Sequence, residues 1–350
     1  MNAFGSRPDL LFWLRETDPE SLKSLWNWAD RTRKKHVGDQ VHLRGLIEIG
    51  NRCGRDCRYC GLRRSNTRLP RYRMNREQIL DCVDKAVDSG YGTVVLQGGE
   101  HSTLETVWIE RVIRDIKARH DIAVTVSFGE RHLDHYRIWR EAGADRVLLK
   151  FETSDRRLFG RLHPAPPDGH EQDRIRMLPR LREMGYEIGS GIIVGLPGQN
   201  IESLADDLLL FAELDLDMIA VGPFVLHPDT PLAQRERTGF HVIEQVEPSV
   251  LMTMKMVALS RILVPSANIP ATTALASIDP DGFAKGLSAG ANIIMPNITP
   301  APWRAFYSIY PGSISSKFND MHNFVHAEIH KSGRVPGQGQ GARTDLYLDR

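Results

Sequence analysis

The stretch VHLRGLIEIGNRCGRDCRYC (residues 41–60) combines a strand pattern with a cluster of cysteines. Residues 41–49 are rich in β-branched and apolar side chains, which predicts a buried strand. The loop that follows holds three of the chain's four cysteines, Cys53, Cys57 and Cys60. A disulfide uses two thiols and a closed zinc site uses four ligands. Three thiolates therefore indicate a metal site that keeps one position open.

Seven further runs of the same apolar, β-branched kind follow, and amphipathic stretches of helical period separate them. Two of these stretches begin at a candidate N-cap, Asn75 and Asn200, and a third is expected to stop at Pro265. Eight β–α units predict an α/β fold, a complete parallel (β/α)8 barrel of the TIM type. An open doubly wound sheet is the alternative, but it usually places a glycine-rich phosphate turn after the first strand. The seven runs cover residues 92–97, 122–128, 145–151, 187–195, 218–226, 268–274 and 291–298.

Three segments are expected along the chain. Residues 1–38 form a helical N-terminal extension, with a helix over about 18–36, and residues 39–311 form the barrel. Residues 312–350 form a C-terminal extension that is polar and rich in glycine towards its end. Such an end is expected to wrap loosely around the barrel or to be mobile.

Composition narrows the class of protein. The chain has 350 residues, of which 41% are hydrophobic and 25% charged, enough for a large core. The net charge of +1 gives no general attraction to nucleic acid or to a membrane surface. No apolar run approaches the roughly 20 residues of a membrane span, and no secretory signal pattern is visible. Few cysteines, most of them clustered, favour a reducing compartment, so we predict a cytoplasmic protein.

The position of the cysteine loop favours an iron–sulfur cluster over zinc. Loops after the strands carry the catalytic groups of a (β/α)8 barrel, and thiolates suit both metals. A zinc site would need a histidine or Cys82 as its fourth ligand. Cys82 lies within a predicted helix, and the histidines nearest in sequence are His42 and His101, neither of them in the loop. A protein that only carries metal to a partner remains an alternative.

The spacing Cys-x3-Cys-x2-Cys, with Tyr59 before the last cysteine, resembles the signature of the radical SAM enzymes. The resemblance implies one [4Fe-4S] cluster held by Cys53, Cys57 and Cys60. It implies that the amino and carboxylate groups of S-adenosylmethionine (SAM) chelate the fourth iron. It further implies that transfer of one electron cleaves SAM to a 5′-deoxyadenosyl radical, and that the enzyme works under anaerobic conditions.

Other stretches resemble the family's SAM-binding segments. LQGGE (96–100) resembles the glycine-rich segment that meets the SAM amino group, and glycine there lets a ligand approach the backbone closely. A bare turn would show the same two glycines. Arg174 is expected to pair with the SAM carboxylate, although a solvated helix charge fits it equally well. GIIVGLPGQ (191–199) resembles the segment beside the adenine. The expected cofactor-binding residues are Tyr59, Gln97, Gly98, Gly99, Glu100, Glu152, Arg174 and Gly195.

Longer stretches, among them RYRMNREQI (71–79) and GANIIMPNITP (290–300), resemble the HydE family of [FeFe]-hydrogenase maturases. The resemblance covers about residues 36–311. It implies a role in building the hydrogenase active site, with radical attack on the sulfur of an iron–cysteine complex that carries carbon monoxide and cyanide. It also implies transient contacts with other maturases and with an electron donor. The alternative is a HydE-like paralogue that acts on another small amino-acid-derived substrate.

A pocket for an anionic organometallic complex should offer cations, hydroxyls and amides at the strand ends. Lys150 is expected to point inward if Glu152 does, because strand side chains alternate. Trp303 is expected to close the barrel mouth. The expected pocket residues are Lys150, Thr272, Thr273, Asn297, Thr299 and Trp303.

Two features depart from the family pattern. The pair Lys150-Phe151 stands where the family usually has Arg-His, and lysine lacks the planar fork of arginine. Several members carry a second set of cysteines near the C-terminus, but residues 310–330 contain none. We therefore predict a single cluster. His322, His326 and His330 share a spacing of four and are expected on the surface of a short helix.

Overall fold

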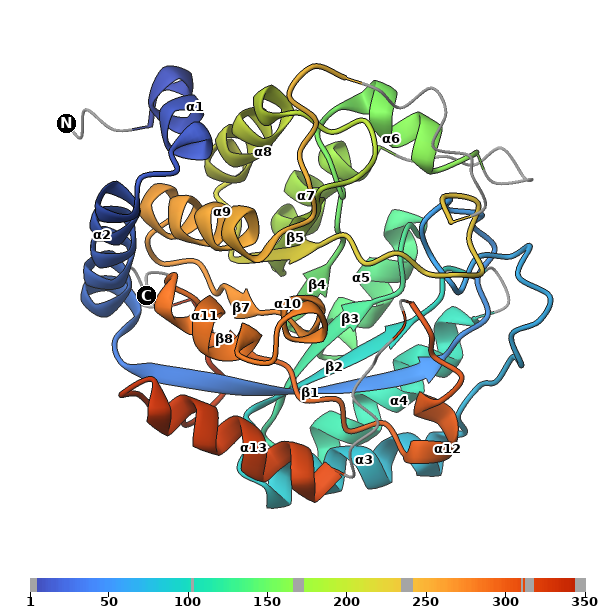
Figure 1. Ribbon diagram of the computed structural model, residues 1–350. Coiled ribbons are helices and arrows are strands. Elements are labelled where there is room, and N and C mark those ends of the chain that lie inside the picture. The colour runs from blue at the N-terminus through green and yellow to red at the C-terminus, as the bar shows by residue number, and fades with distance from the viewer. Residues whose placement is uncertain are drawn as a thin grey trace.

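A computed structural model describes residues 5–101, 104–165, 173–233, 242–309, 311 and 318–343. Eight parallel strands form a barrel in the order β6-β5-β4-β3-β2-β1-β8-β7, and a parallel bridge between Met218 and Asn268 closes it (Figure 1). This confirms the predicted (β/α)8 barrel, and each predicted strand run overlaps one observed strand. The strands are β1 Gln40–Gly50, β2 Thr93–Gly98, β3 Ala123–Ser127, β4 Arg146–Leu148, β5 Glu187–Val194, β6 Met218–Pro223, β7 Pro270–Ala271 and β8 Ile293–Ile294.

Helices alternate with the strands around the barrel. The predicted caps are present, because Asn75 accepts a hydrogen bond from the backbone N–H of Gln78 and Asn200 from that of Ser203. None of the helices in the described part of the chain is long and apolar enough to span a membrane. The helices are α1 Arg7–Arg15, α2 Pro19–Val37, α3 Arg76–Asp88, α4 Thr106–Arg119, α5 Leu133–Glu141, α6 Arg156–Leu162, α7 Arg174–Glu183, α8 Ile201–Glu213, α9 Val250–Leu263, α10 Thr273–Ile278, α11 Gly282–Ser288, α12 Ala301–Arg304 and α13 Phe318–Lys331.

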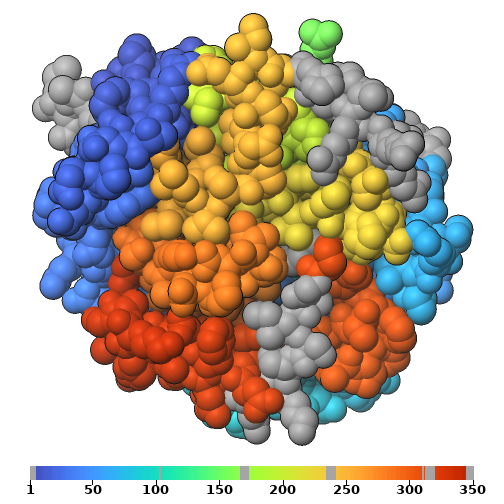
Figure 2. Space-filling view, in the orientation of Figure 1, coloured from blue at the N-terminus to red at the C-terminus, as the bar shows by residue number. Residues whose placement is uncertain are grey.

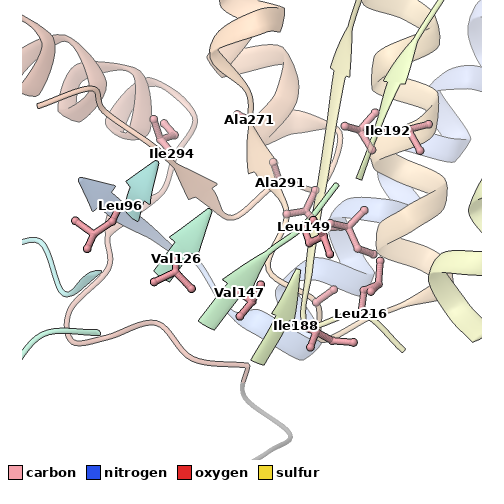
Figure 3. Packing of buried hydrophobic residues seen from close by; sticks show 14 of the residues in the cluster. Leu96, Val126, Val147, Leu149, Ile188, Ile192, Leu216, Ala271, Ala291 and Ile294 are labelled. Atoms are coloured by element: carbon pink, nitrogen blue, oxygen red, sulfur yellow. The ribbon is translucent and has the colours of Figure 1, made fainter. Parts of the chain in front are cut away.

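The hydrophobic core fills the space between the strands and the surrounding helices. Val126, Val147 and Ile188, on neighbouring strands, belong to this core (Figure 3). The N-terminal helices add to it, since α1 packs on α8 and α2 packs on α9. The blue surface of the N-terminal helices adjoins the gold surface of α9 (Figure 2). The predicted helix over 18–36 is therefore α2, whereas α1 was not predicted.

The end of the described chain closes the N-terminal opening of the barrel. A short strand, β9 (Val335–Pro336), pairs with the start of β1. Beyond it, the Gln340 carbonyl accepts a hydrogen bond from Arg146 and the Gly341 carbonyl accepts one from Arg44. The prediction of a loosely packed tail is therefore wrong for residues 335–343. Residues 344–350 lie outside the described part of the chain.

The three histidines of α13 only partly match their prediction. His330 is exposed, but His322 and His326 are half-buried. The ring of His322 stacks on Tyr91, with 5.7 Å between the ring centroids. Residues 310 and 312–317, in the stretch that lacks cysteines, lie outside the described residues.

Candidate active site

A cavity of about 400 Å³ opens at the C-terminal end of the barrel. Every strand, or the segment directly after it, contributes to its wall. Its volume lies within the range of small-molecule sites. Of the predicted site residues, the cavity wall includes Cys53, Cys57, Tyr59, Cys60, Gln97, Gly98, Gly99, Glu100, Lys150, Glu152, Arg174, Thr272, Thr273 and Asn297.

The cysteine loop is seated on the end of β2. The N–H of Gly54 donates to the carbonyl of Glu100 at 2.6 Å. A Cβ atom at Gly99 would lie 2.2 Å from the Arg52 carbonyl oxygen and 3.0 Å from the Cβ of Cys53. Only glycine therefore allows the loop to approach β2 this closely. This contact supports reading LQGGE as part of a site and not as a bare turn.

The side chain of Arg71 holds the cysteine loop together through hydrogen bonds to its backbone. Its guanidinium donates to the carbonyls of Asn51 and Leu62 at 2.7 and 2.9 Å. It also donates to the carbonyls of Arg63 and Asn66 at 2.7 and 3.1 Å. Four backbone carbonyls on one side chain fix the path of a loop that has no regular secondary structure of its own.

The three thiols line one wall of the cavity and are largely desolvated. Burial raises the pKa of the Cys60 thiol to about 12, and burial also raises the pKa of Cys57 and Cys53. No three histidine, cysteine or acidic side chains in the described residues surround a single metal-ion position. A four-iron cluster makes a different demand, because each cysteine binds its own iron. Three cavity-facing thiols on one loop fit that demand.

Cys82 lies away from the loop. It belongs to α3, is fully buried in the hydrophobic core and does not line the cavity. Its position argues against its service as a fourth ligand beside the loop cysteines.

Arg174 meets two carboxylates beside the thiols. Its Nε donates to Glu130 Oε1 at 2.6 Å, and its Nη2 lies 3.5 Å from Glu100 Oε2. Arg55 lies 3.6 Å from each of the same two carboxylates. Burial lowers the pKa of Arg174, but the carboxylates of Glu130 and Glu100 outweigh burial and raise it. Arg174 is therefore a buried member of an ionic network and not a solvated helix charge.

Glu100 is fixed from a third direction. Its Oε2 accepts a hydrogen bond from the backbone N–H of Glu130 at 2.9 Å. Gly129 has φ +70°, and a Cβ there would lie 2.1 Å from Glu100 Oε2. Burial raises the pKa of Glu100, while Arg174 lowers it. Gly129 thus lets the backbone after β3 hold the carboxylate of Glu100, which follows β2.

Tyr59 is held by a histidine. Its hydroxyl lies 2.6 Å from His163 Nε2, and His163 Nδ1 lies 3.1 Å from the Phe159 carbonyl. Because that carbonyl accepts only, Nδ1 carries the proton, so Nε2 accepts from the tyrosine. Burial lowers the pKa of His163 well below its ordinary value. A neutral imidazole therefore fixes the aromatic ring beside the cysteines.

Lys150 and Phe151, which stand where the family usually has Arg-His, face different surroundings: Lys150 faces the cavity and Phe151 lies in the core. Lys150 Nζ lies 3.0 Å from Glu152 Oε2, and both side chains line the cavity, as alternation predicts. Glu152 adopts φ +64°, a left-handed conformation that is rare outside glycine. Phe151 is buried against Phe211 of α8, with ring centroids 5.7 Å apart. Only the lysine half of the pair therefore reaches the substrate space.

Three predicted site residues do not line the cavity. Gly195 has φ +86°, and its Cβ would lie 2.3 Å from the nitrogen of Pro248, so packing explains this glycine. Thr299 is fully buried and accepts a hydrogen bond from the N–H of Glu48. Trp303 stacks on Tyr72 at 5.2 Å instead of closing the mouth.

Sequence reasoning missed several residues that belong to the site. Glu130 ends SFGE (127–130), directly after the third strand, so its position offered the same signal as Glu100 and Glu152. His163 follows a helix and gave no signal. Glu48 and Tyr307 line the cavity but sit in stretches that had been interpreted only as a strand and as part of the barrel's end.

Comparison with known proteins supports this geometry. A family model of the radical SAM superfamily matches residues 47–211. The chain is 45% identical to the [FeFe] hydrogenase maturase subunit HydE of Thermotoga maritima, over 93% of this chain and 90% of that protein. It is 28% identical to 3-methylornithine synthase of Methanosarcina acetivorans, over 83% of this chain and 78% of that protein.

Solved structures show the same fold. Methylornithine synthase (PylB) superimposes with a TM-score of 0.81, 23% identity and coverage of 99% of this chain and 97% of that one. HydG, a maturase of the [FeFe]-hydrogenase, gives 0.78, 19% identity and coverage of 96% and 73%. Radical SAM enzymes use a [4Fe-4S] cluster and SAM, which the three thiols and the adjoining cavity fit. The chain is a radical SAM enzyme and belongs to the HydE family of [FeFe]-hydrogenase maturases.

Proposed function

We propose that this enzyme acts in the assembly of the [FeFe]-hydrogenase active site, on a sulfur-containing iron–cysteine complex that carries carbon monoxide and cyanide. The observation that carries the proposal is the 45% identity to a HydE protein along almost the whole of both chains. When bound, the cluster and SAM supply a 5′-deoxyadenosyl radical. The cavity gives such a radical an enclosed space, with Lys150 and Thr272 on its wall.

The residues around the thiols divide the work of binding SAM in this proposal. Cys53, Cys57 and Cys60 hold three irons. Arg174 and Glu100, already oriented by their network, meet the SAM carboxylate and amino groups. When a SAM group replaces one partner in this network, Arg174 and Glu100 each still have an opposite charge beside them. Because the site is already charged and oriented, the free-energy cost of desolvating SAM is lower.

A defined in vitro maturation of [FeFe]-hydrogenase tests the proposal. The reconstituted, reduced protein takes the place of HydE beside the other maturases, and hydrogen evolution is measured. Restored hydrogenase activity, with release of 5′-deoxyadenosine and methionine, is the expected result. SAM cleavage without maturation would instead support the paralogue. Absence of SAM cleavage would support a protein that only carries metal.

Lys150 gives the paralogue a specific basis. It faces the cavity at the place where the family usually has arginine, and its partner is Glu152 at 3.0 Å. An ammonium group binds an anion as a point charge and lacks the two-pronged contact of a guanidinium. A Lys150→Arg variant with higher maturation activity than the wild type would show that this position limits the HydE reaction.

We also propose two kinds of transient partner. One is an acidic electron donor, and the other is the set of maturases with which this enzyme exchanges substrate and product. Residues 51–76 contain nine arginines and one aspartate, a formal charge of +8 in a chain whose net charge is +1. Arg52 and Arg64 are exposed on this loop, which carries the thiols. Complementary charge speeds protein association and makes it sensitive to salt. None of the four cysteines, all within the described residues, forms a disulfide, which is consistent with our placement of the enzyme in the cytoplasm.

Reduction kinetics test the partner. An Arg64→Glu variant should be reduced more slowly by an acidic protein donor at low salt and normally by a small chemical reductant. Lys35→Glu, on α2, is the matched control. Equal rates for Arg64→Glu and the wild type at low salt would argue against docking on this loop.

A further inference from the structure

Glu48 is a carboxyl group on the cavity wall that none of the roles above uses. It lies near the end of β1, where Leu46 and Glu48 line the cavity in the alternation of a strand. Its side chain is only slightly accessible, with 6% of the residue exposed. The carboxyl is therefore accessible to a ligand in the cavity but shielded from bulk water.

Glu48 differs from the other charged residues of this wall. Lys150 pairs with Glu152, and both cavity-facing arginines pair with Glu100. Within the described residues, no ion pair is formed by Glu48, and its Oε2 has no hydrogen-bond partner.

The cation that acts on Glu48, Arg304, makes its hydrogen bonds elsewhere. Arg304 attracts Glu48 electrostatically. Its Nε and Nη2, however, donate to the Thr299 carbonyl at 3.1 and 2.7 Å. The carboxyl group of Glu48 therefore lies in a field of opposite charge without a cation bound to it.

The position of Glu48 is fixed on both sides. Its N–H donates to Thr299 Oγ1 at 2.8 Å, and its carbonyl accepts from the Tyr72 hydroxyl at 2.7 Å. Asn297 Oδ1 accepts from the N–H of Thr299 at 3.0 Å, which leaves the amide nitrogen of Asn297 to hydrogen-bond with the Glu48 carboxyl. The carboxyl is preorganised, as binding groups in sites usually are.

A purely structural role does not explain the charge of Glu48. Burial raises the pKa of Glu48 to about 7, against the opposing effect of Asn297 and Thr299. A buried carboxylate without a cation is unfavourable, and a glutamine would accept the same hydrogen bonds without that penalty. An unpaired carboxyl aimed into a cavity is instead what a cationic ligand group requires.

We propose that Glu48 binds the ammonium group of an amino-acid-derived substrate. Lys150, after β4, and Thr272, after β7, lie on other parts of the same wall and suit the anionic groups of such a molecule. Glu48 on β1 then supplies the opposite charge, so the cavity is complementary to a zwitterion. The inference depends on the proposed function only for the amino-acid character of the substrate.

A pair of probes that differ in the amino group tests this role. S-methyl-L-cysteine and its des-amino analogue 3-(methylthio)propanoate are titrated into the anaerobic, cluster-loaded protein with SAM, and affinity is measured by calorimetry. We expect wild type to prefer the amino compound, and Glu48→Gln to lose at least about tenfold in affinity for it alone. A folded Glu48→Gln variant that keeps the preference overturns the proposal, as does a wild type with no preference.

Two variants guard against a structural explanation. Asp207→Asn is the matched control, because Asp207 is also a buried carboxyl whose pKa burial raises to about 7, but it does not line the cavity. It should keep the full preference. Glu48→Asp retains the charge and should keep part of the preference, which covers the case that Glu48→Gln fails to fold. Far-UV circular dichroism and iron content report folding and cluster loading.

The maturation assay separates this proposal from the proposed function. Loss of the amino preference in Glu48→Gln, together with failed maturation by wild type, would uphold Glu48 and support the paralogue. Full maturation by wild type and by Glu48→Gln alike would uphold the function and overturn the role of Glu48.

Discussion

At the C-terminal end of the barrel, Arg174 meets the carboxylates of Glu100 and Glu130. At the N-terminal end, Arg44 and Arg146 meet the backbone carbonyls of the tail, and Arg146 also pairs with Glu187 at 2.9 Å. The first group surrounds a cavity of about 400 Å³, and the second is covered by residues 335–343. Backbone carbonyls cannot leave without unfolding the tail, whereas a side-chain carboxylate can exchange one partner for a ligand. Buried charge therefore serves stability at one end and binding at the other, the usual division in (β/α)8 barrels.

The largest effect is expected at the open end. Cys57→Ala removes one cluster ligand. The absorbance of the iron–sulfur cluster at about 400 nm and all SAM cleavage should therefore be lost, while the barrel stays folded. Iron content and 5′-deoxyadenosine release measure this. Cys82→Ala is the control, because Cys82 is buried in α3 away from the cavity, and it should keep its iron. Iron loss in the control would reveal a fourth protein ligand.

Arg174→Met should affect both stability and SAM binding. It removes one of the cations beside Glu100 and Glu130, while Arg55 stays 3.6 Å from each carboxylate. Removal of one partner from a buried ionic network costs about 3–5 kcal/mol. Urea unfolding of the cluster-free protein measures that loss, and calorimetry measures SAM affinity. Weaker SAM binding with unchanged stability would mean that the two carboxylates are protonated or hydrated in the folded state.

At the closed end, Gly92→Ala should detach the tail without touching the chemistry. A Cβ there would lie 1.7 Å from the Gly339 carbonyl oxygen, so the tail must move. We expect about 1–3 kcal/mol of destabilisation, as for overpacking, and faster proteolysis within residues 335–343. SAM cleavage by folded protein should persist.

The matched control for this substitution is Gly160→Ala in α6. A Cβ at Gly160 meets no atom within 4 Å, so the variant should be neutral or slightly stabilising. Loss of SAM cleavage in Gly92→Ala would show that the two ends of the barrel are coupled, and that the closed end also contributes to the chemistry.

The sequence was sufficient for the barrel because its signals are local. Apolar strand runs and the Asn75 and Asn200 caps depend on neighbours in the chain, and each appears where it was expected. The cysteine spacing was similarly local. Glu130 offered the same strand-end signal as Glu100, but its partnership with Arg174 depends on which strand ends lie side by side. His163 gained its role only through the packing of α6, which no linear pattern encodes.

The tail shows the same limit most clearly. Its contacts with Arg44 and Arg146 use the carbonyls of Gln340 and Gly341, and backbone groups leave no trace in composition. From its sequence alone, a glycine-rich, polar segment of this kind is therefore predicted to be a mobile end. The three predicted residues outside the cavity wall have different local causes: Thr299 follows β8 but points into the core, Trp303 belongs to α12, and Gly195 is set by its packing against Pro248.

The smallest effect on the structure concerns Asp207, because its substitution changes only how stability depends on pH. Asp207 Oδ1 accepts a hydrogen bond from the N–H of Ser154 at 2.6 Å, just beyond Glu152. Burial raises its pKa from 3.8 to about 7 in the folded state. Because a raised carboxyl pKa favours folding only while the group is protonated, this stability is present below pH 4 and is lost as pH rises through about 7. Asp207→Asn should remove that dependence and gain about 1–3 kcal/mol over wild type at pH 8 relative to pH 5. Urea unfolding at the two pH values measures the difference. If the free energy of unfolding of Asp207→Asn differs from that of wild type by the same amount at pH 5 and at pH 8, Asp207 is ionised at both pH values. This part of the open end would then also bury a stabilised charge.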